Sequence, residues 1–204
     1  MSPIISAKGG LSSQGYGQFA STGTPYTLVG NYDALATVTV PSGGLSSITF
    51  AGIPSTYTHL QIRAFVKTNR STYGRDEFFL RFNDDSTSSN YSWHTLYGDG
   101  GTAAAYAAPT ESYIDAGYIS GGVGTSMFGA AVVDILDYKN PSKYKTTRSL
   151  TGHDHNGAIA GIHAIVNLNS GLWKSTSAIN SIKIAVISGT AFNEYSSFAL
   201  YGVK

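Results

Sequence analysis

The final stretch of the chain, residues 178–204, constrains the fold more than any other. Ile182, Ile184 and Val186 recur with a period of two, and Phe198 and Leu200 repeat that period after the turn-rich residues 188–195. Residues i and i+2 of a strand share a face, so each segment predicts a β-strand with one apolar side. We expect an antiparallel strand pair whose final residues belong to the hydrophobic core. The predicted core side chains are Ile182, Ile184, Val186, Phe198 and Leu200.

The same period of two recurs along the rest of the chain. Turn signals rich in Gly, Pro, Asn and Asp separate the segments, and no window of helical length keeps a helical period. One segment, residues 144–151, is polar throughout and predicts a strand with an exposed face. The pattern predicts an all-β protein, a two-sheet antiparallel β-sandwich that is jelly-roll-like, with about ten strands. The expected strands cover residues 36–40, 45–50, 60–67, 77–82, 112–119, 128–138, 144–151, 160–168, 182–186 and 198–203.

An internal echo supports a fold with two similar sheets. Residues 47–50, a tyrosine-bearing loop and a strand from Leu60 parallel residues 181–184, a tyrosine-bearing loop and a strand from Phe198. The echo is too short to define a duplicated unit, but it fits two sheets built from similar hairpins.

The domain organisation follows from length and local composition. A chain of 204 residues is typical of one all-β domain. Residues 1–24 are rich in Gly and Ser and lack periodicity, which predicts an N-terminal arm ahead of a single β-sandwich domain at 25–204. A frayed terminus is the common fate of such a segment. Its apolar side chains instead favour contact with the body or a neighbouring subunit, and the candidate interface residues are Ile4, Ile5, Leu11, Tyr16 and Phe19.

Composition excludes several classes of partner. Charged residues make up 12% of the chain, against about 25% in typical soluble domains. A net charge of +1 without a basic run gives no footprint for nucleic acid. No apolar run reaches the ~18 residues of a membrane span, and residues 1–10 do not resemble a secretory signal. The neutral, tyrosine-rich surface favours packing against other subunits, and we expect a protein made in the cytoplasm.

Three segments resemble a pattern that recurs in structural proteins of tailed bacteriophages. Residues 50–63 contain Ile53-Pro54-x-Thr56-Tyr57, residues 81–91 contain Phe82-Asn83-x-Asp85, and the chain ends on Ser196-x-Phe198-x-Leu200-Tyr201-Gly202. The similarity covers residues 45–204. It departs from the family at Asp84, where other members carry Gly, which leaves the geometry of that turn open. The resemblance implies a virion component with a β-sandwich or jelly-roll body, located on the head or the tail, and it brings no catalytic residues.

Three groups of residues are candidates for metal binding or acid–base chemistry. His153 and His155 share a strand face and suit Zn²⁺ or Ni²⁺, although the Gly and Asn-Gly around them favour an exposed turn. Asp84 and Asp85 offer oxygen ligands for Ca²⁺ but lack the spacing of an EF-hand, and Asx turns explain them as well. Asp134 and Asp137 are offset by three residues, which predicts opposite faces rather than a catalytic pair. We therefore expect no catalytic residues, no metal and no cofactor.

Two functions of different classes remain open. The first is a capsid decoration (cement) protein on the outer head surface, a homotrimer bound to the major capsid protein or other virion proteins. The second is a tail or fibre-associated adhesin that binds a host surface glycan. Aromatic side chains that could stack on sugar rings are equally suited to a protein interface: Trp93, Tyr97, Tyr106, Tyr113, Tyr118 and Trp173. The chain has no sequence resembling a fibre stalk, which favours the first function.

Overall fold

The computed structural model describes residues 31–123, 126–154 and 164–204. These residues form twelve strands and no helix. The strands are β1 (Tyr32–Thr39), β2 (Ser47–Ala51), β3 (His59–Val66), β4 (Arg75–Phe82), β5 (Tyr91–Gly98), β6 (Ala103–Glu111), β7 (Ile114–Ser120), β8 (Gly129–Leu136), β9 (Lys145–His153), β10 (Ile165–Trp173), β11 (Ser181–Val186) and β12 (Ser197–Val203).

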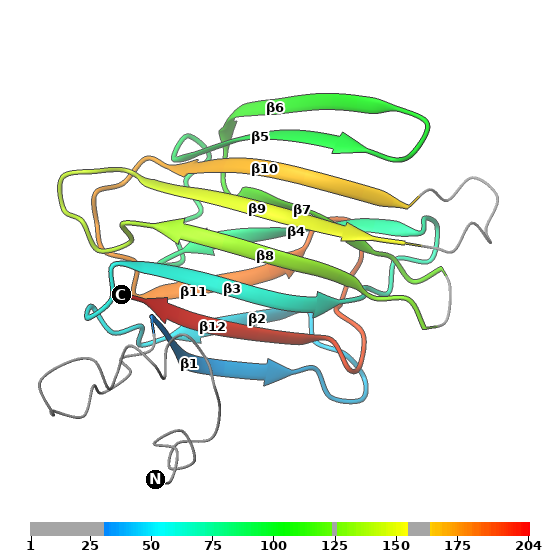
Figure 1. Cartoon of the computed structure of the whole chain (residues 1–204), viewed down its shortest axis with the longest axis horizontal. Helices are drawn as coiled ribbons and strands as arrows, with labels where there is room; N and C mark the ends of the chain where they lie inside the picture. The colour runs from blue at the N-terminus through cyan, green and yellow to red at the C-terminus, as the bar shows by residue number, and fades with distance from the viewer. Residues whose placement is uncertain (1–30, 124–125, 155–163) are drawn as a thin grey trace, which may run out of the picture. The chain divides into compact units, whose positions relative to one another are not determined.

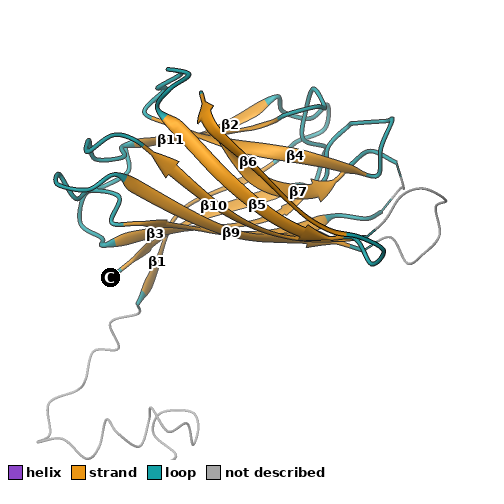
Figure 2. Cartoon of the chain, turned by 90° about the horizontal axis from the view of Figure 1, so that it is seen from above, coloured by secondary structure: helices purple, strands orange, loops and turns teal. Residues whose placement is uncertain are grey.

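The strands build two antiparallel sheets that stack as a β-sandwich (Figures 1 and 2). The larger sheet has eight strands in the order β1-β12-β3-β8-β9-β10-β5-β6, and the smaller has four in the order β2-β11-β4-β7. The all-β, two-sheet prediction is confirmed, with twelve strands rather than about ten.

Eight of the twelve strands follow the wiring of a jelly roll, in which two Greek keys form two four-stranded sheets. These are β1-β12-β3-β8 in one sheet and β2-β11-β4-β7 in the other. Two further pairs, β5–β6 and β9–β10, join the β8 side and double the width of the first sheet. Strands β5 and β6 were not expected from the sequence. For β6 the reason is its alanine content, because alanine has a low β-propensity.

The hydrophobic core lies mainly where the two four-stranded parts face each other, and Tyr91 of β5 and Trp173 of β10 extend it. Alternate residues of β3 and β8 point inward, as the period of two requires. From the smaller sheet, alternate residues of β4 and β11 meet them. The largest fully buried apolar side chains include Phe78, Phe82, Tyr91, Tyr138, Phe192 and Phe198.

The C-terminal segment crosses between the sheets, so the predicted strand pair is wrong. β11 pairs with β2 and β4 in the smaller sheet, whereas β12 pairs with β1 and β3 in the larger one. The β2-to-β3 connection makes the same crossing, so the two echoed segments lie side by side in both sheets. Both ends of each crossing bury an apolar face, which is why they resembled hairpins. Of the predicted core residues, Ile182, Ile184, Phe198 and Leu200 are buried and Val186 is partly buried against the core.

The chain divides into two units, Met1–Asn31 and Tyr32–Lys204. All twelve strands belong to the second unit. The candidate interface residues Ile4, Ile5, Leu11, Tyr16 and Phe19 lie outside the described residues. The helix-free described part also lacks any segment that would cross a bilayer as a helix.

Candidate interaction surface

Strands β9 and β10 carry their polar residues inward and their apolar residues outward. On β9, Thr147, Ser149 and Thr151 are buried while Leu150 is exposed, and β10 repeats this with Asn167 and Asn169 inside. Residues 144–151 were predicted to be a polar strand with an exposed face, and this prediction is wrong in orientation. The arrangement reverses the usual one for a sheet with one solvated face, where polar residues point outward.

The inward polar side chains bind the backbone of β7, the edge strand of the smaller sheet. Ser149 Oγ donates to the Ala116 carbonyl at 2.7 Å, and Asn169 Nδ2 donates to the Asp115 carbonyl at 3.1 Å. The Tyr118 N–H donates to Asn167 Oδ1 at 3.1 Å. Unpaired edge-strand groups are otherwise a template for pairing with other chains, so these bonds protect the edge.

The close approach of β7 to the larger sheet requires glycine at two positions. Gly117 has a φ of +117°, and a Cβ there would collide with Asn167 and Thr151. A Cβ on Gly171 of β10 would collide with Ile114 and Thr147. Little room is left for large apolar side chains under β7, which explains why short polar residues face inward here.

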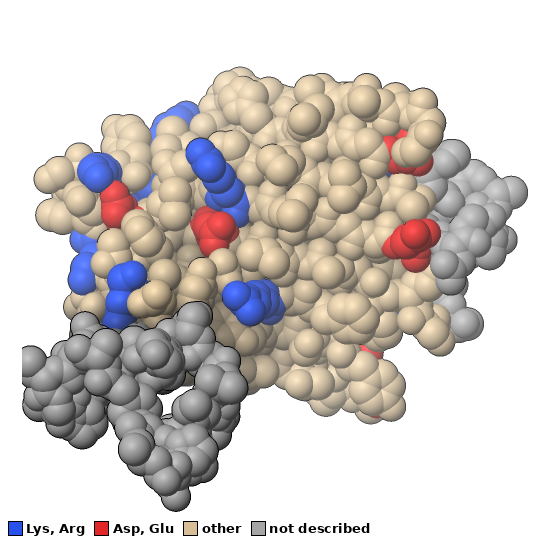
Figure 3. Space-filling model, in the orientation of Figure 1, with Lys and Arg blue, Asp and Glu red and all other residues tan. Residues whose placement is uncertain are grey.

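The outward side of the same strands carries a continuous apolar row. Strand register places Val132 beside Leu150, Leu150 beside Leu168, and Leu168 beside Leu96. Their exposed fractions are 37%, 55%, 53% and 58% in that order. In the space-filling view, this face of the larger sheet is a broad area with few charged side chains (Figure 3). Contiguous exposed apolar patches of this kind mark interaction sites.

A second row beside the first is made largely of small residues. Phe65 lies beside Ala130, Ala130 beside Gly152, and Gly152 beside Val166. Phe65 is 51% exposed and Val166 is 61% exposed. We call these two rows, from β3 to β6, the outer face.

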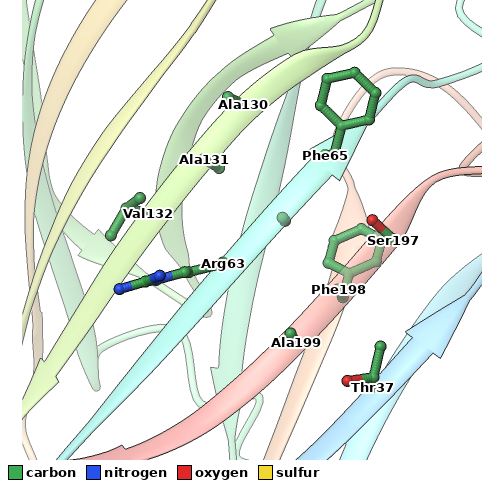
Figure 4. A pocket seen from close by; sticks show the side chains of 10 residues that line it. Thr37, Arg63, Phe65, Ala130, Ala131, Val132, Ser197, Phe198 and Ala199 are labelled. Carbon is green, nitrogen blue, oxygen red and sulfur yellow. The ribbon is translucent and has the colours of Figure 1, made fainter. Parts of the chain in front are cut away.

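The outer face contains a shallow hollow of about 340 Å³ at its β3 side (Figure 4). The side chains of Phe65 and Arg63 project beside the hollow, and the small side chains of Ala130 and Ala199 line it. The Arg63 guanidinium lies 5.5 Å and 5.3 Å from the ring centroids of Tyr32 and Tyr201, a cation–π arrangement. The hollow could accept a side chain from a partner that covers the face.

Polar side chains border the outer face along one side. Gln61 Nε2 donates to Asp134 Oδ1 at 2.7 Å, and Arg63 Nε donates to Gln61 Oε1 at 2.8 Å. The same row continues across the sheet. Asp134 lies beside Arg148, Arg148 beside Ser170, and Ser170 beside His94. Charged and polar groups at the edge of an apolar centre are typical of a protein interface.

A separate aromatic cluster joins the two sheets at the inner side of β5 and β6. The rings of Tyr97 and Tyr106 stack at 5.8 Å, and Tyr118 meets Tyr97 edge-on at 5.6 Å. The Arg75 guanidinium lies 4.9 Å from the Tyr118 ring centroid. A hydrogen bond with Tyr106 raises the pKa of Tyr97, and burial raises the pKa of Glu77, which adjoins Tyr118.

The other aromatic candidates lie apart from this cluster. Trp173 is buried and packs on Tyr91 and Phe82, while Tyr113 packs on Phe79. Trp93 is partly buried against the core. The structure therefore brings together three of the six aromatic residues named from the sequence.

The candidate metal and acid–base residues are engaged in local structure. Asp85 accepts hydrogen bonds from Trp173 Nε1, Asn90 Nδ2 and the Thr87 N–H. Burial alone would raise the pKa of Asp85, but these bonds lower it to about 2. Asp84 has a φ of +55°, a left-handed conformation that Gly adopts at no steric cost.

The remaining candidates do not form a shared site in the described structure. His153 is buried at the end of β9 rather than in an exposed turn, and His155 lies outside the described residues. Asp134 is in the polar border of the outer face, whereas Asp137 pairs with Lys143 at 2.7 Å in the following turn. Within residues 31–123, 126–154 and 164–204, no group of three His, Asp or Glu side chains is placed to hold a metal.

Comparisons with known proteins do not identify a family for this chain. No protein-family model matches the chain, and searches of curated proteins and of solved structures find no match either. The class that the structure defines is a jelly-roll sandwich with one sheet enlarged by two hairpins and an apolar outer face.

Proposed function

We propose that this protein is a structural component of a tailed-phage virion, a decoration (cement) protein on the outer surface of the head. It acts by packing its outer face against other virion subunits. The observation that carries the proposal is the exposed apolar row Val132–Leu150–Leu168–Leu96. The resemblance of residues 45–204 to phage structural proteins supplies the setting.

The energetics of the outer face support an association role. Burying a large aliphatic side chain contributes about 1.5–3 kcal/mol relative to leaving it exposed. Four such side chains in one row therefore offer a partner several kcal/mol, part of which offsets the cost of association. A protein that worked alone would gain from polar residues at these positions, because they would improve its solubility.

The test is the composition of purified particles from the source. Mass spectrometry of gradient-purified virions is expected to detect the chain, and electron cryo-microscopy is expected to place its sandwich on the head. Full-length protein and a variant lacking residues 1–24 are then compared for binding to undecorated capsids, since the arm is expected to anchor the domain. Absence of the chain from virions would refute the proposed structural role. Full capsid binding by the variant lacking residues 1–24 would refute the expectation that the arm anchors the domain.

A second candidate, a tail or fibre-associated adhesin for a host glycan, is favoured by the Tyr97–Tyr106–Tyr118 cluster. Tyr106 is 55% exposed, so one ring is available to stack on a sugar. Against this reading, the Tyr97–Tyr106 stack and the Arg75 contact already occupy much of the aromatic surface. A Tyr106→Ala variant that loses binding to host cells, while Tyr195→Ala retains it, would support the adhesin.

A further inference from the structure

We propose that the outer face is covered by a second copy of this chain. The two copies pack face to face about a two-fold axis that runs along the strands, between β9 and β10. This inference rests on the premise of the proposed function that the outer face is an association surface. It adds the identity of the partner and the register of the contact, and it proposes a two-fold dimer in place of the homotrimer expected from the sequence.

The size of the outer face fits a stable interface between two copies. From β3 to β6 the larger sheet spans six strands of eight or nine residues each. With strands about 4.8 Å apart and about 3.3 Å per residue, the whole outward side of these strands, the outer face together with its polar border, is about 700 Å² in plan. Standard protein–protein interfaces bury about 800 Å² on each partner. Covering the outer face and its polar border with a second copy therefore gives an area close to this standard size.

A two-fold axis between β9 and β10 places apolar side chains opposite one another. It sets β9 against β10 of the second copy, β8 against β5, and β3 against β6. By strand register, Leu150 then faces the partner's Leu168, and Val132 faces the partner's Leu96. In each copy, all four residues of the apolar row are thus buried against the apolar row of the other copy.

The same axis matches large residues with small ones in the second row. Val166 faces the partner's Gly152, and Phe65 faces the partner's Ala103. Packed sheets need this alternation, because side chains from two faces interdigitate across about 10 Å.

The polar border is also self-complementary under this axis. Asp134 faces the partner's His94, and Arg148 faces Ser170 of the partner subunit. The axis places no two like charges opposite each other along this row. A surface patch that complements itself is what an isologous dimer requires.

The first experiment measures self-association of the full chain by sedimentation. We expect the wild type to form a species of twice the 21.5 kDa chain mass. Leu168→Lys removes the central apolar contact and buries two uncompensated charges per dimer, so it should raise the dimer dissociation constant at least about a hundredfold. Tyr195→Lys is the matched control, since Tyr195 is 71% exposed and lies off the outer face. Unchanged dimerisation of Leu168→Lys, or a wild-type monomer or trimer, would overturn the proposal.

The second experiment tests the register and does not depend on a destabilising variant. The chain contains no cysteine, so single cysteines can be placed at will. Val132→Cys and Leu96→Cys proteins are mixed and treated with a short bis-maleimide cross-linker. Facing residues lie about 10 Å apart across packed sheets. The two copies of one residue, at position 132 or at position 96, are separated in addition by three strand spacings across the sheet, about 14 Å. The mixture should therefore cross-link, and each variant alone should not.

The outcomes separate this inference from the proposed function. A monomer that is present in virions would overturn the pairing and leave the virion role intact. A dimer that is absent from virions would support the pairing and refute the role. Cross-linking within each single variant, rather than in the mixture, would overturn the placement of the axis.

Discussion

Replacing Asp115 by asparagine tests how the buried polar layer under β7 affects stability. Asp115 is 7% exposed, and the Gly117 N–H donates to its carboxyl at 2.8 Å. Burial raises its pKa to about 7, although that hydrogen bond lowers it, and the negative charge of Glu77 raises it further. Asparagine keeps an acceptor for the Gly117 N–H but cannot ionise.

The direction of the effect follows from proton binding. The folded-state pKa of about 7 exceeds the ordinary value of 3.8, so the folded protein holds the proton more tightly than the unfolded chain. The contribution of Asp115 to stability is therefore full below about pH 4 and is lost as the pH rises to about 7. Three pKa units at 1.36 kcal/mol each give an upper value of about 4 kcal/mol.

The assay is urea unfolding of wild type and Asp115→Asn between pH 4 and pH 8.5. The free energy of unfolding of Asp115→Asn, relative to that of wild type, should rise by up to about 4 kcal/mol across this pH range. The difference should level off above pH 7. Glu77, whose pKa is also raised by burial, is present in both proteins, so its own burial contributes equally to both and only its interaction with Asp115 remains in the difference. A difference that stays constant with pH would refute the reasoning, because it would mean that the ionised carboxylate is solvated or paired.

Three further predictions concern single sites. Phe198 is fully buried and meets Phe192 at 4.9 Å, so Phe198→Ala should cost about 3–5 kcal/mol in urea unfolding. The neighbouring change Ala199→Ser on the outer side should cost below about 0.5 kcal/mol, and equal costs would contradict this orientation. Asp76 is fully buried and accepts four hydrogen bonds, three of them from backbone N–H groups, so Asp76→Asn should lower the unfolding free energy by about 2–3 kcal/mol. Chelation should leave the melting temperature unchanged, because Asp85 already uses its oxygens within the chain; a drop of several degrees would reveal a metal.

The local pattern of the sequence was sufficient for strands with one apolar face. Ile182, Ile184 and Leu200 alternate with polar or small residues, and each is buried. What the pattern could not give is the partner of each strand. A hairpin and a crossing between sheets both need two apolar-faced strands and a connection. The length of the connection between β11 and β12, residues 187–196, was an available signal, because hairpin loops usually have two to five residues.

The candidate surface could not be located from the sequence because its pattern is inverted. Alternation in β9 and β10 shows two faces, and the polar one was assigned to solvent. The structure buries it because β7 lies close against these strands and accepts bonds from Ser149 and Asn169. That contact joins residues more than thirty positions apart in the chain, a separation that periodicity cannot bridge.

The position of the outer face connects the fold to the proposed role. On the jelly-roll strand β12 the outward residues are Ser197, Ala199, Tyr201 and Val203; the first two offer little apolar area, and the ring of Tyr201 lies against Arg63. The apolar row is carried mainly by the added strands, with Leu96, Leu150 and Leu168 on β5, β9 and β10. The two hairpins therefore enlarge the sheet, bind the edge strand β7 with their inner side and present leucines with their outer side. The hairpins also contribute Tyr91 of β5 and Trp173 of β10 to the core, so their inner side serves the fold, and their outward leucines are left for the association that we propose.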